Sequence, residues 1–201
     1  MFYTPAEGHG LPHNPFNAIV APRPIGWIGT RGRMGDNLAP YSFFNAVAYT
    51  PPQVIFASTS AKAEREGTKD SMANIRETGV FSVSIVSGAL MAAMNETSAA
   101  FAAGVDEFAA ARVEKAECRA IDCPRVSRAP ATLECRLVQI VPLLGAANFL
   151  AVGEVVGVHL ADDCLQEGRF MLPASGLIGR LGYQDYAVIR EGVRLARPGE
   201  R

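Results

Sequence analysis

The sequence lacks the features that mark several common classes of protein. Lysine occurs at only three of its 201 positions (62, 69 and 115), and no block of basic residues occurs, so neither nucleic acid nor an anionic membrane is expected as a partner. No apolar run approaches the roughly 20 residues that span a bilayer. No basic segment followed by an apolar run, the mark of a signal peptide, opens the chain. A soluble, cytoplasmic protein is therefore expected.

The familiar motifs of catalysis and metal binding are also missing. The four cysteines form no Cys-x-x-Cys pair, and His9, His13 and His159 show no metal-ligand spacing, so no metal site is expected. The cysteines are interpreted as small thiols, buried or partly exposed, and the histidines as surface residues. No catalytic triad can be assembled, and neither a Gly-x-Gly-x-x-Gly nor a Walker motif occurs. An enzyme of this kind is a candidate for chemistry carried by a cofactor.

What the sequence does contain predicts a mainly β protein with inserted helices. Hydrophobic residues make up 49 % of the chain, enough for a substantial core. Strands are expected at 17–21, 24–30, 37–48, 53–59, 80–86, 132–143, 149–160 and 186–190, and helices at 70–76 and, broken near Gly104, within 88–112. Short turns between strands favour an antiparallel barrel over a doubly wound sheet. We expect a single domain, 1–201, with an N-terminal arm (1–16) and a C-terminal tail (190–201).

The helix expected at 70–76 carries several local signals. Asp70 or Ser71 can cap its start, and Met72 and Ile75 are spaced to face inward. Gly79 stands where a helix C-terminus favours a left-handed residue. Further along the chain, the Asp106-Glu107 pair suits the first turn of a second helix, where carboxylates interact favourably with the helix dipole.

One stretch combines apolar strands with unusually short residues. Asn37, Ala39, Pro40 and Ser42 interrupt a run of bulky residues between 23 and 45. Such residues suggest a backbone that a flat ring can approach closely. The alternative is a turn at Asn37 followed by a strand bulge, and the local sequence leaves both interpretations open.

A second group of residues suits an anion. Ser58-Thr59-Ser60 places hydroxyls at a strand end, and Lys69-Asp70-Ser71 adds an ammonium group and backbone N–H groups at a helix start. A phosphate could bind there, or these residues could be ordinary caps beside a solvated lysine. Arg23 is equally open, as a solvated edge residue or as a partner of a phosphate or ring edge. Trp27 is interpreted as a core residue.

Taken together, these blocks resemble the flavin reductase-like family. The resemblance runs from Arg23 to Tyr186 and rests on the order and spacing of several motifs. These are Arg-Pro-Ile-Gly-Trp-Ile-Gly-Thr from 23, Gly-Asp-Asn-Leu-Ala-Pro-Tyr-Ser-Phe-Phe from 35, Lys-Asp-Ser from 69, Asp-Glu-Phe from 106, Gly-Glu-Val from 153 and Arg-Leu-Gly-Tyr from 180. The family implies an FMN-binding split β-barrel of Greek-key type and, usually, a homodimer.

The resemblance also implies a cofactor site. Asn37, Ala39, Pro40 and Ser42 would line the isoalloxazine; Ser58, Thr59, Ser60, Lys69 and Ser71 would hold the phosphate; Arg180 and Tyr183 would lie near the cofactor. Better-studied members carry a histidine five residues before the glycine that matches Gly153. This chain has Asn148 there, a possible contact on the nicotinamide side.

The function implied is that of an NAD(P)H:flavin reductase, which passes a hydride from NADH or NADPH to FMN. The reduced flavin could then serve a partner oxygenase or another redox protein. Two alternatives stay open. One is an electron-transfer flavoprotein with tightly bound FMN, similar to flavoredoxin, and the other is a non-enzymatic FMN-binding module. The catalytic residues are not identified by the sequence.

Overall fold

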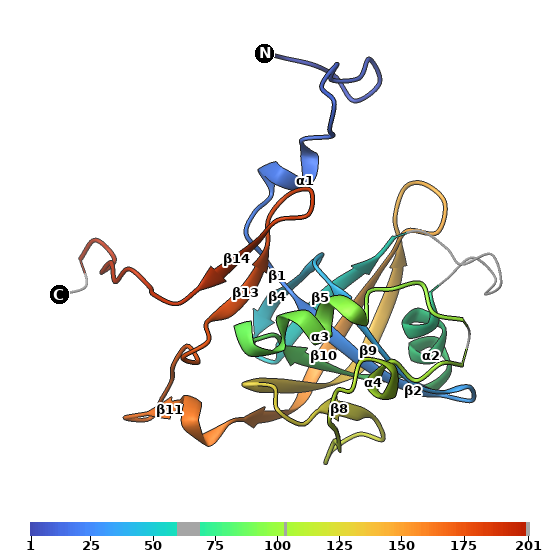
Figure 1. The fold of residues 1–201 in the computed structure, drawn as a ribbon, viewed down its shortest axis with the longest axis vertical. Helices are drawn as coiled ribbons and strands as arrows, with labels where there is room; N and C mark the ends of the chain where they lie inside the picture. The colour runs from blue at the N-terminus through green and yellow to red at the C-terminus, as the bar shows by residue number, and fades with distance from the viewer. Residues whose placement is uncertain (60–68, 103, 200–201) are drawn as a thin grey trace.

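A computed structural model describes residues 1–59, 69–102 and 104–199 of the chain. Its main feature is an antiparallel sheet of seven strands in the order β3-β2-β6-β9-β10-β5-β4 (Figure 1). These strands are β2 Gly26–Gly32, β3 Gly35–Tyr41, β4 Phe44–Tyr49, β5 Pro52–Ser58, β6 Val80–Ile85, β9 Ala131–Pro142 and β10 Phe149–Leu160. Hairpin pairs, such as β2 with β3, are combined with crossover pairs, such as β2 beside β6, in line with the expected Greek-key type.

The connection between β3 and β4 shows that this sheet is curled into a barrel. The two strands lie at opposite edges of the sheet, yet only Ser42 and Phe43 separate them. Six strand spacings would put the edges of a flat sheet roughly 29 Å apart, whereas the step from Tyr41 to Phe44 reaches at most about 11 Å. No ladder pairs β3 with β4 among the described strands, so the barrel is split there. The predicted split β-barrel is confirmed.

The barrel interior is packed with aromatic and aliphatic side chains. Phe56 and Phe81 are fully buried and meet edge to face, with ring centroids 5.5 Å apart. Helix α2 (Asp70–Thr78) covers the barrel with Met72 and Ile75, both fully buried as predicted. Gly79 ends this helix with φ of 71°, which confirms the predicted left-handed C-terminus.

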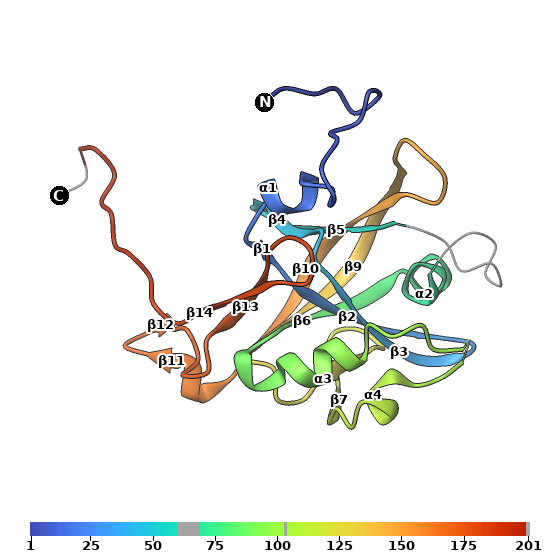
Figure 2. The ribbon, with the colours of Figure 1, turned by 45° about the horizontal axis from the view of Figure 1, so that its top comes forward.

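A second core lies on the outer side of β2 and β3. Trp27 and Leu38 pack there against Met94 of α3 (Met91–Glu96) and Phe108 of α4 (Glu107–Ala110). Figure 2 shows these helices beside the β2–β3 hairpin. The indole Nε1 of Trp27 donates to Thr97 Oγ1 at 2.9 Å, so the tryptophan is a core residue, as predicted. Strand β2 is thus buried on both faces, which gives β3 a rigid support.

The remaining elements are short. They are α1 Phe16–Ile19, β1 Arg23–Pro24, η1 Gly88–Leu90, β7 Lys115–Glu117, β8 Pro124–Val126, η2 Asp162–Cys164, β11 Leu165–Gln166, β12 Arg169–Phe170, β13 Leu177–Arg180 and β14 Tyr186–Ile189. Strands β1, β13 and β14 form a small sheet, and both ends of the chain project from the body (Figure 1). In the described part of the chain, no helix is long and apolar enough to cross a membrane. The single-domain organisation stays a prediction.

Three local predictions are wrong. Residues 17–21 are not a strand, because Asn14 accepts a hydrogen bond from Phe16 N at 3.0 Å and Pro15 starts the helical turn of α1. Residues 37–48 are not one strand, since the chain changes sheet edge at positions 42–43. Neither Asp70 nor Ser71 caps α2, which begins after Lys69 without a side-chain cap. The long strands expected at 132–143 and 149–160 are confirmed as β9 and β10.

The cysteines and His159 have structural positions. All four cysteines are free thiols; three are buried and Cys118 is half-buried, as expected. His159 is not a surface residue, because its side chain is 18 % exposed and its Nε2 meets the buried carboxylate of Glu134. That carboxylate also accepts from the backbone N–H groups of Arg119 and Ala120, at 2.7 and 2.6 Å. These contacts fasten the loop after β7 to the barrel.

Candidate cofactor site

The side chain of Asn37 joins three elements of the fold. Its Nδ2 donates to Glu107 Oε2 at 2.8 Å, and its Oδ1 accepts from Ser71 Oγ at 3.0 Å. The same Glu107 oxygen accepts from the backbone N–H of Leu38 at 3.0 Å. All of these residues are buried. Strand β3 is therefore held to the starts of α2 and α4, and the Asn37 amide is oriented by its two partners.

A first cavity of about 320 Å³ opens beside this cluster. Its wall contains five of the predicted site residues: Asn37, Ala39, Pro40, Lys69 and Ser71. Residues 97–100, which follow α3, and Glu107 complete the wall together with Tyr41 and Asp70. The structure thus brings residues predicted for the ring and residues predicted for the phosphate into one cavity, although about 30 positions separate the two groups in the sequence.

A buried phenol lies in the same wall. Tyr41 is 5 % exposed, and burial raises its pKa to about 12, although Ser71 and Ser58 beside the hydroxyl oppose this shift. None of the described groups completes a hydrogen bond of good geometry to Tyr41 Oη. Lys69 Nζ lies 5.4 Å from the centroid of the Tyr41 ring. Ser58 is fully buried at the end of β5, beside the Tyr41 hydroxyl.

A second cavity of about 690 Å³ adjoins the first. The two cavities share Pro40 and Ser98. The second contains the predicted residues Ser42 and Arg180, and its other lining residues are Ile25, Met91, Ala92, Met94, Asn95, Gln184 and Tyr186. Arg180 donates to the Tyr186 hydroxyl and to the Tyr183 carbonyl, and its guanidinium stacks on the Tyr186 ring at 4.5 Å.

Among the described residues, four predicted ones line neither cavity: Ser58, Thr59, Tyr183 and Asn148. Ser60 lies outside the described residues, and Thr59 follows β5 in a half-buried position. Tyr183 is 51 % exposed, with φ of 55°, and packs against His13 at 5.6 Å. Asn148 lies in the β9–β10 connection, where its Nδ2 donates to Leu144 O at 2.8 Å. Their cofactor roles stay predictions.

Arg23 does not fit the first of the two interpretations given to it from the sequence, and the second stays a prediction. It is only 7 % exposed, so it is not a solvated edge residue. Its guanidinium donates to the backbone carbonyl oxygens of Asn17, Val20 and Leu181, and thereby ties α1 to the segment after β13. Burial, and then the nearby charge of Arg180, lower the pKa of Arg23.

Glu107 is the residue of this site whose role the sequence did not reveal. It was expected only as a charge in the first turn of a helix. In the structure it is 5 % exposed, and burial raises its pKa although hydrogen bonds from Leu38 and Asn37 oppose the shift. Its partner Asn37 is 70 positions away, so no local pattern could have linked them. The Asp-Glu-Phe block at 106–108 was the available signal.

A network of charges supports the same region from outside. Asp36 Oδ2 lies 2.7 Å from Lys115 Nζ, and Asp36 Oδ1 lies 2.7 Å from Arg31 Nε. Lys115 also pairs with Asp106, the residue that caps α4, at 2.7 Å. Burial opposes ionisation of Asp36, but the hydrogen bonds from Arg31 and Lys115 hold its pKa below the usual range. The network fixes α4, and with it Glu107, against the β2–β3 hairpin.

The sequence and the fold were compared with known proteins. The flavin reductase like domain matches residues 20–185. A protein of Deinococcus radiodurans named only as uncharacterized is 40 % identical over 190 residues, which cover 90 % of this chain and 82 % of that one. The structure of nitrilotriacetate monooxygenase component B from Bacillus cereus is 31 % identical, with a TM-score of 0.88, over 97 % of this chain and 98 % of its own. The 2-nitrobenzoate 2-nitroreductase of Pseudomonas fluorescens is 27 % identical, with a TM-score of 0.78, over 92 % and 89 %.

The matched region contains the whole seven-stranded sheet. It also contains every lining residue of the two cavities except Tyr186. The match covers far more than half of the chain, in agreement with the motifs from Arg23 onward. The chain therefore belongs to the flavin reductase-like family.

Proposed function

We propose that this protein binds FMN and acts as an NAD(P)H-dependent flavin reductase. The observation that carries the proposal is the first cavity, where Asn37, Ala39 and Pro40 face the same space as Lys69 and Ser71. Bound FMN would supply hydride transfer from a nicotinamide, which needs little acid–base chemistry from the protein. The side chains would bind and orient the cofactor and exclude water from it.

The residues present suit the chemistry of FMN. Lys69 offers a cation to a phosphate, and the start of the nine-residue helix α2 offers backbone N–H groups. The Ser71 hydroxyl donates to Asn37. Tyr41 Oη is a buried polar atom that the described residues leave without a well-placed partner. Ala39 and Pro40 present little side-chain bulk, which suits the close approach of a flat ring. Asn37 and Ser42 supply small polar groups on the same strand and just after it.

The proposal extends to the electron donor and the electron acceptor. NADH or NADPH is proposed as the donor, and a diffusing reduced flavin could serve an oxygenase, because a relative is a monooxygenase component B. An electron-transfer flavoprotein is the second candidate. It is favoured by the position of Asn148, which lies in the β9–β10 connection and lines neither cavity.

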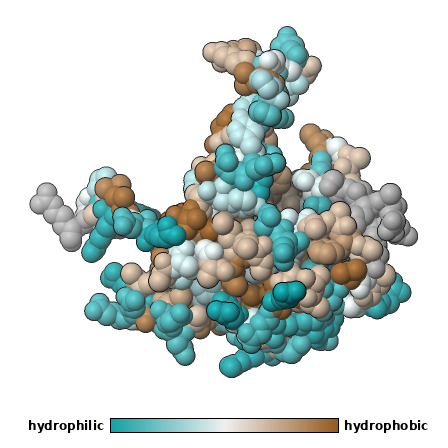
Figure 3. Space-filling view, in the orientation of Figure 1, coloured by the Kyte–Doolittle hydropathy of each residue, from teal (hydrophilic) through white to brown (hydrophobic). Residues whose placement is uncertain are grey.

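A homodimer is part of the same proposal. Exposed apolar side chains occur on α1 and on the edge strand β4, where Ile19 is 71 % and Tyr49 is 91 % exposed. Figure 3 shows further hydrophobic residues on the two projecting ends of the chain. Large exposed apolar groups of this kind are typical of interfaces. Light scattering of the purified protein would measure the mass, and a monomer at all concentrations would contradict the dimer. The cytoplasmic location stays a prediction.

The test of the function is spectroscopic. The protein is purified, supplied with FMN and washed, and its visible spectrum is recorded before and after anaerobic addition of NADH or NADPH. Retained flavin that is bleached by either nucleotide is the expected result. Retained flavin that neither nucleotide bleaches would favour the electron-transfer protein. A protein that neither retains flavin nor bleaches added FMN with either nucleotide would contradict both.

A further inference from the structure

Two arginines lie directly opposite each other in the small sheet. Strand β1 pairs with β13 in a register that places Arg23 against Arg180. Like charges at directly opposed positions of an antiparallel pair repel each other. Arg23 is 7 % exposed and Arg180 is half-buried, so water screens this repulsion incompletely. The arrangement costs stability unless an anion compensates it.

The groups that contact these two arginines are neutral. Arg23 donates to three backbone carbonyl oxygens, and Arg180 donates to a phenol and to one carbonyl oxygen. In the described ranges neither guanidinium has a carboxylate partner. The pair therefore holds two positive charges that the surrounding side chains do not neutralise.

Arg180 places one of these positive charges in the wall of the second cavity. It lies in the cavity wall, whereas Arg23 stands behind it on the neighbouring strand. A guanidinium has five N–H donors, and the contacts to Tyr183 and Tyr186 account for two of them. Tyr186 also supports the guanidinium through its ring, 4.5 Å away. Arg180 is thus held in place with donors left for a ligand.

The rest of the second cavity suits a flat, partly apolar molecule. Ile25, Met91, Met94 and Pro40 supply apolar surface, and methionine side chains adapt to varied shapes. The cavity volume of about 690 Å³ lies in the usual range of small-molecule sites. The described wall contains Arg180 as a cation and no carboxylate. A ligand with an anionic group next to an apolar body would match both features.

We infer that the second cavity binds a second reactant through an anionic group held by Arg180, with Arg23 reinforcing the positive charge. The expected ligand is a planar molecule that carries a carboxylate or a phosphate. An aromatic carboxylate would supply the first of these groups, and a reduced nicotinamide dinucleotide would supply the second. The inference deepens the proposed function, on which it rests, because the two cavities meet at Pro40 and a ligand in the second would lie next to the cofactor.

The test uses two pairs of ligands that differ in charge. Benzoate is compared with benzamide, and reduced nicotinamide mononucleotide with reduced nicotinamide riboside, which lacks its phosphate. Binding is measured by calorimetry at low ionic strength, with and without FMN. At least one anionic member is expected to bind tenfold or more tightly than its neutral analogue, the order of one charge-assisted hydrogen bond. The pair that shows the preference identifies the source of the anion.

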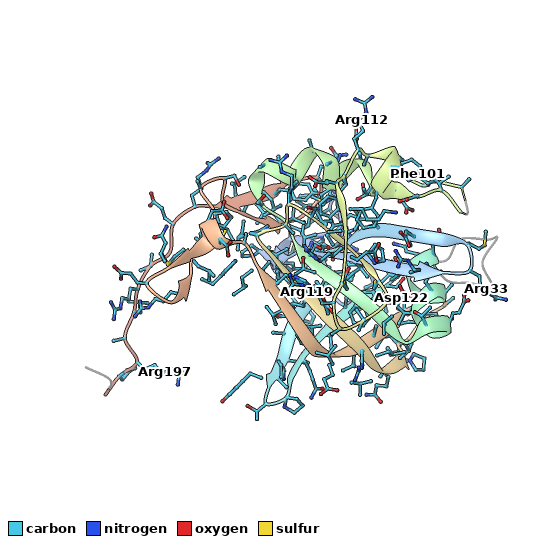
Figure 4. All side chains as sticks on the ribbon, turned by 90° about the horizontal axis from the view of Figure 1, so that it is seen from below. Arg33, Phe101, Arg112, Arg119, Asp122 and Arg197 are labelled. Atoms are coloured by element: carbon cyan, nitrogen blue, oxygen red, sulfur yellow. The ribbon has the colours of Figure 1, made fainter. Side chains whose placement is uncertain are left out.

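Variants of Arg180 then test whether this residue causes the preference for the anionic ligand. Arg180→Gln should remove the preference for the anion, and Arg180→Lys should restore part of it. Arg112→Gln is the matched control, because Arg112 is exposed and points away from the barrel (Figure 4). If the Arg180 variants do not fold, the wild-type protein is tested at higher salt concentration instead. Salt should weaken the binding of the anionic ligand and leave the binding of the neutral ligand unchanged.

Two results would overturn the inference: equal binding of both members in each pair, or a preference that survives in Arg180→Gln. Failure both to retain FMN and to bleach added FMN with either nucleotide would contradict the proposed function instead. The calorimetric comparison without FMN still decides the role of Arg180 in that case, so the two failures are distinguishable.

Discussion

Glu107 Oε2 lies 2.8 Å from Asn37 Nδ2, and this contact orients the amide at the centre of the proposed cofactor site. Since Oε2 also accepts from the backbone N–H of Leu38, the carboxylate holds both the side chain and the strand that carries it. The opposite side of the amide accepts from Ser71 Oγ. The orientation of the Asn37 side chain therefore depends on Ser71 of α2 and Glu107 of α4, both of which lie outside the strand that carries Asn37.

Two replacements of Glu107 should distinguish the effect of its charge from the effect of its hydrogen bonds. Glu107→Gln keeps an oxygen that can accept from Asn37 and Leu38, so FMN affinity should be retained. Glu107→Ala leaves two buried donors unpaired and should lower the free energy of unfolding by about 1–3 kcal/mol. It should also weaken FMN binding. Urea unfolding and FMN titration of both variants measure these effects, and equal behaviour of Gln and Ala would contradict the positioning role.

The raised pKa of Glu107 leads to a prediction about how the stability of the protein depends on pH. Burial raises the pKa of Glu107 in the folded protein above the usual value of about 4.3. A raised pKa means that the folded state holds the proton more tightly. The contribution of Glu107 to stability is thus present below about pH 4.3 and is lost as the pH rises through the folded pKa. Glu107→Gln should remove this loss. Urea unfolding from pH 4 to 7 checks it, and identical pH profiles for both proteins would refute it.

Lys69 is predicted to contribute a charge-assisted contact to the phosphate of FMN. Lys69→Ala should weaken FMN binding by about 1–3 kcal/mol, and Lys69→Arg should keep most of the affinity. The difference between wild type and Lys69→Ala should shrink as salt is added. Fluorescence titration with FMN measures the affinities, with Arg112→Ala as an exposed control. Unchanged affinity in Lys69→Ala would remove this residue from the site.

Asp36 should be the acid-sensitive member of the charge network. Its hydrogen bonds from Arg31 and Lys115 hold its folded pKa below the usual value of about 3.9. This contribution to stability is present above that value and is lost as the pH falls through the lower folded pKa. Asp36→Asn should cost about 1–3 kcal/mol at pH 7 and flatten the dependence of stability on pH in acid.

Asp122→Asn is the control for this experiment. Asp122 also contacts Arg31, at 2.6 Å, but its side chain is 84 % exposed (Figure 4). An exposed ion pair contributes about 0–1 kcal/mol. Chemical denaturation of both variants at pH 7 and pH 3 compares the two carboxylates. An equal loss of stability in both would show that burial of Asp36 has no special effect.

Gly153 is predicted to be required by packing in the barrel. A Cβ added there would lie 2.4 Å from Cζ of Phe81 and 3.3 Å from Cβ of Cys135, both of which are buried. Gly153→Ala should therefore lower the free energy of unfolding by about 1–3 kcal/mol, as overpacking of a core does. Gly192→Ala is the control, since nothing lies within 4 Å of its added Cβ. Similar melting curves for both variants would contradict the prediction.

Much of the fold could be predicted because its signals are local. The long strands β9 and β10 have high β-propensity and clear turns, and Gly79 ends α2 with a conformation that glycine adopts readily. The segment at 17–21 was predicted wrongly because a short apolar run suits either a strand or a helical turn. There the contact of Asn14 with Phe16 N decided the outcome.

By itself, the sequence determined most of the strands, the family and the two groups of residues that the first cavity unites. These follow from periodicity and motif spacing, which act over a few neighbouring positions. Only the tertiary structure decided that Glu107 orients Asn37, that Arg23 binds backbone carbonyls, and that Arg180 faces a second cavity. The contact of Glu107 with Asn37 joins positions 70 residues apart, and that of Arg23 with Leu181 joins positions 158 residues apart. They exist because the folded chain packs α4 against β3 and pairs β13 with β1, elements that are distant in the sequence.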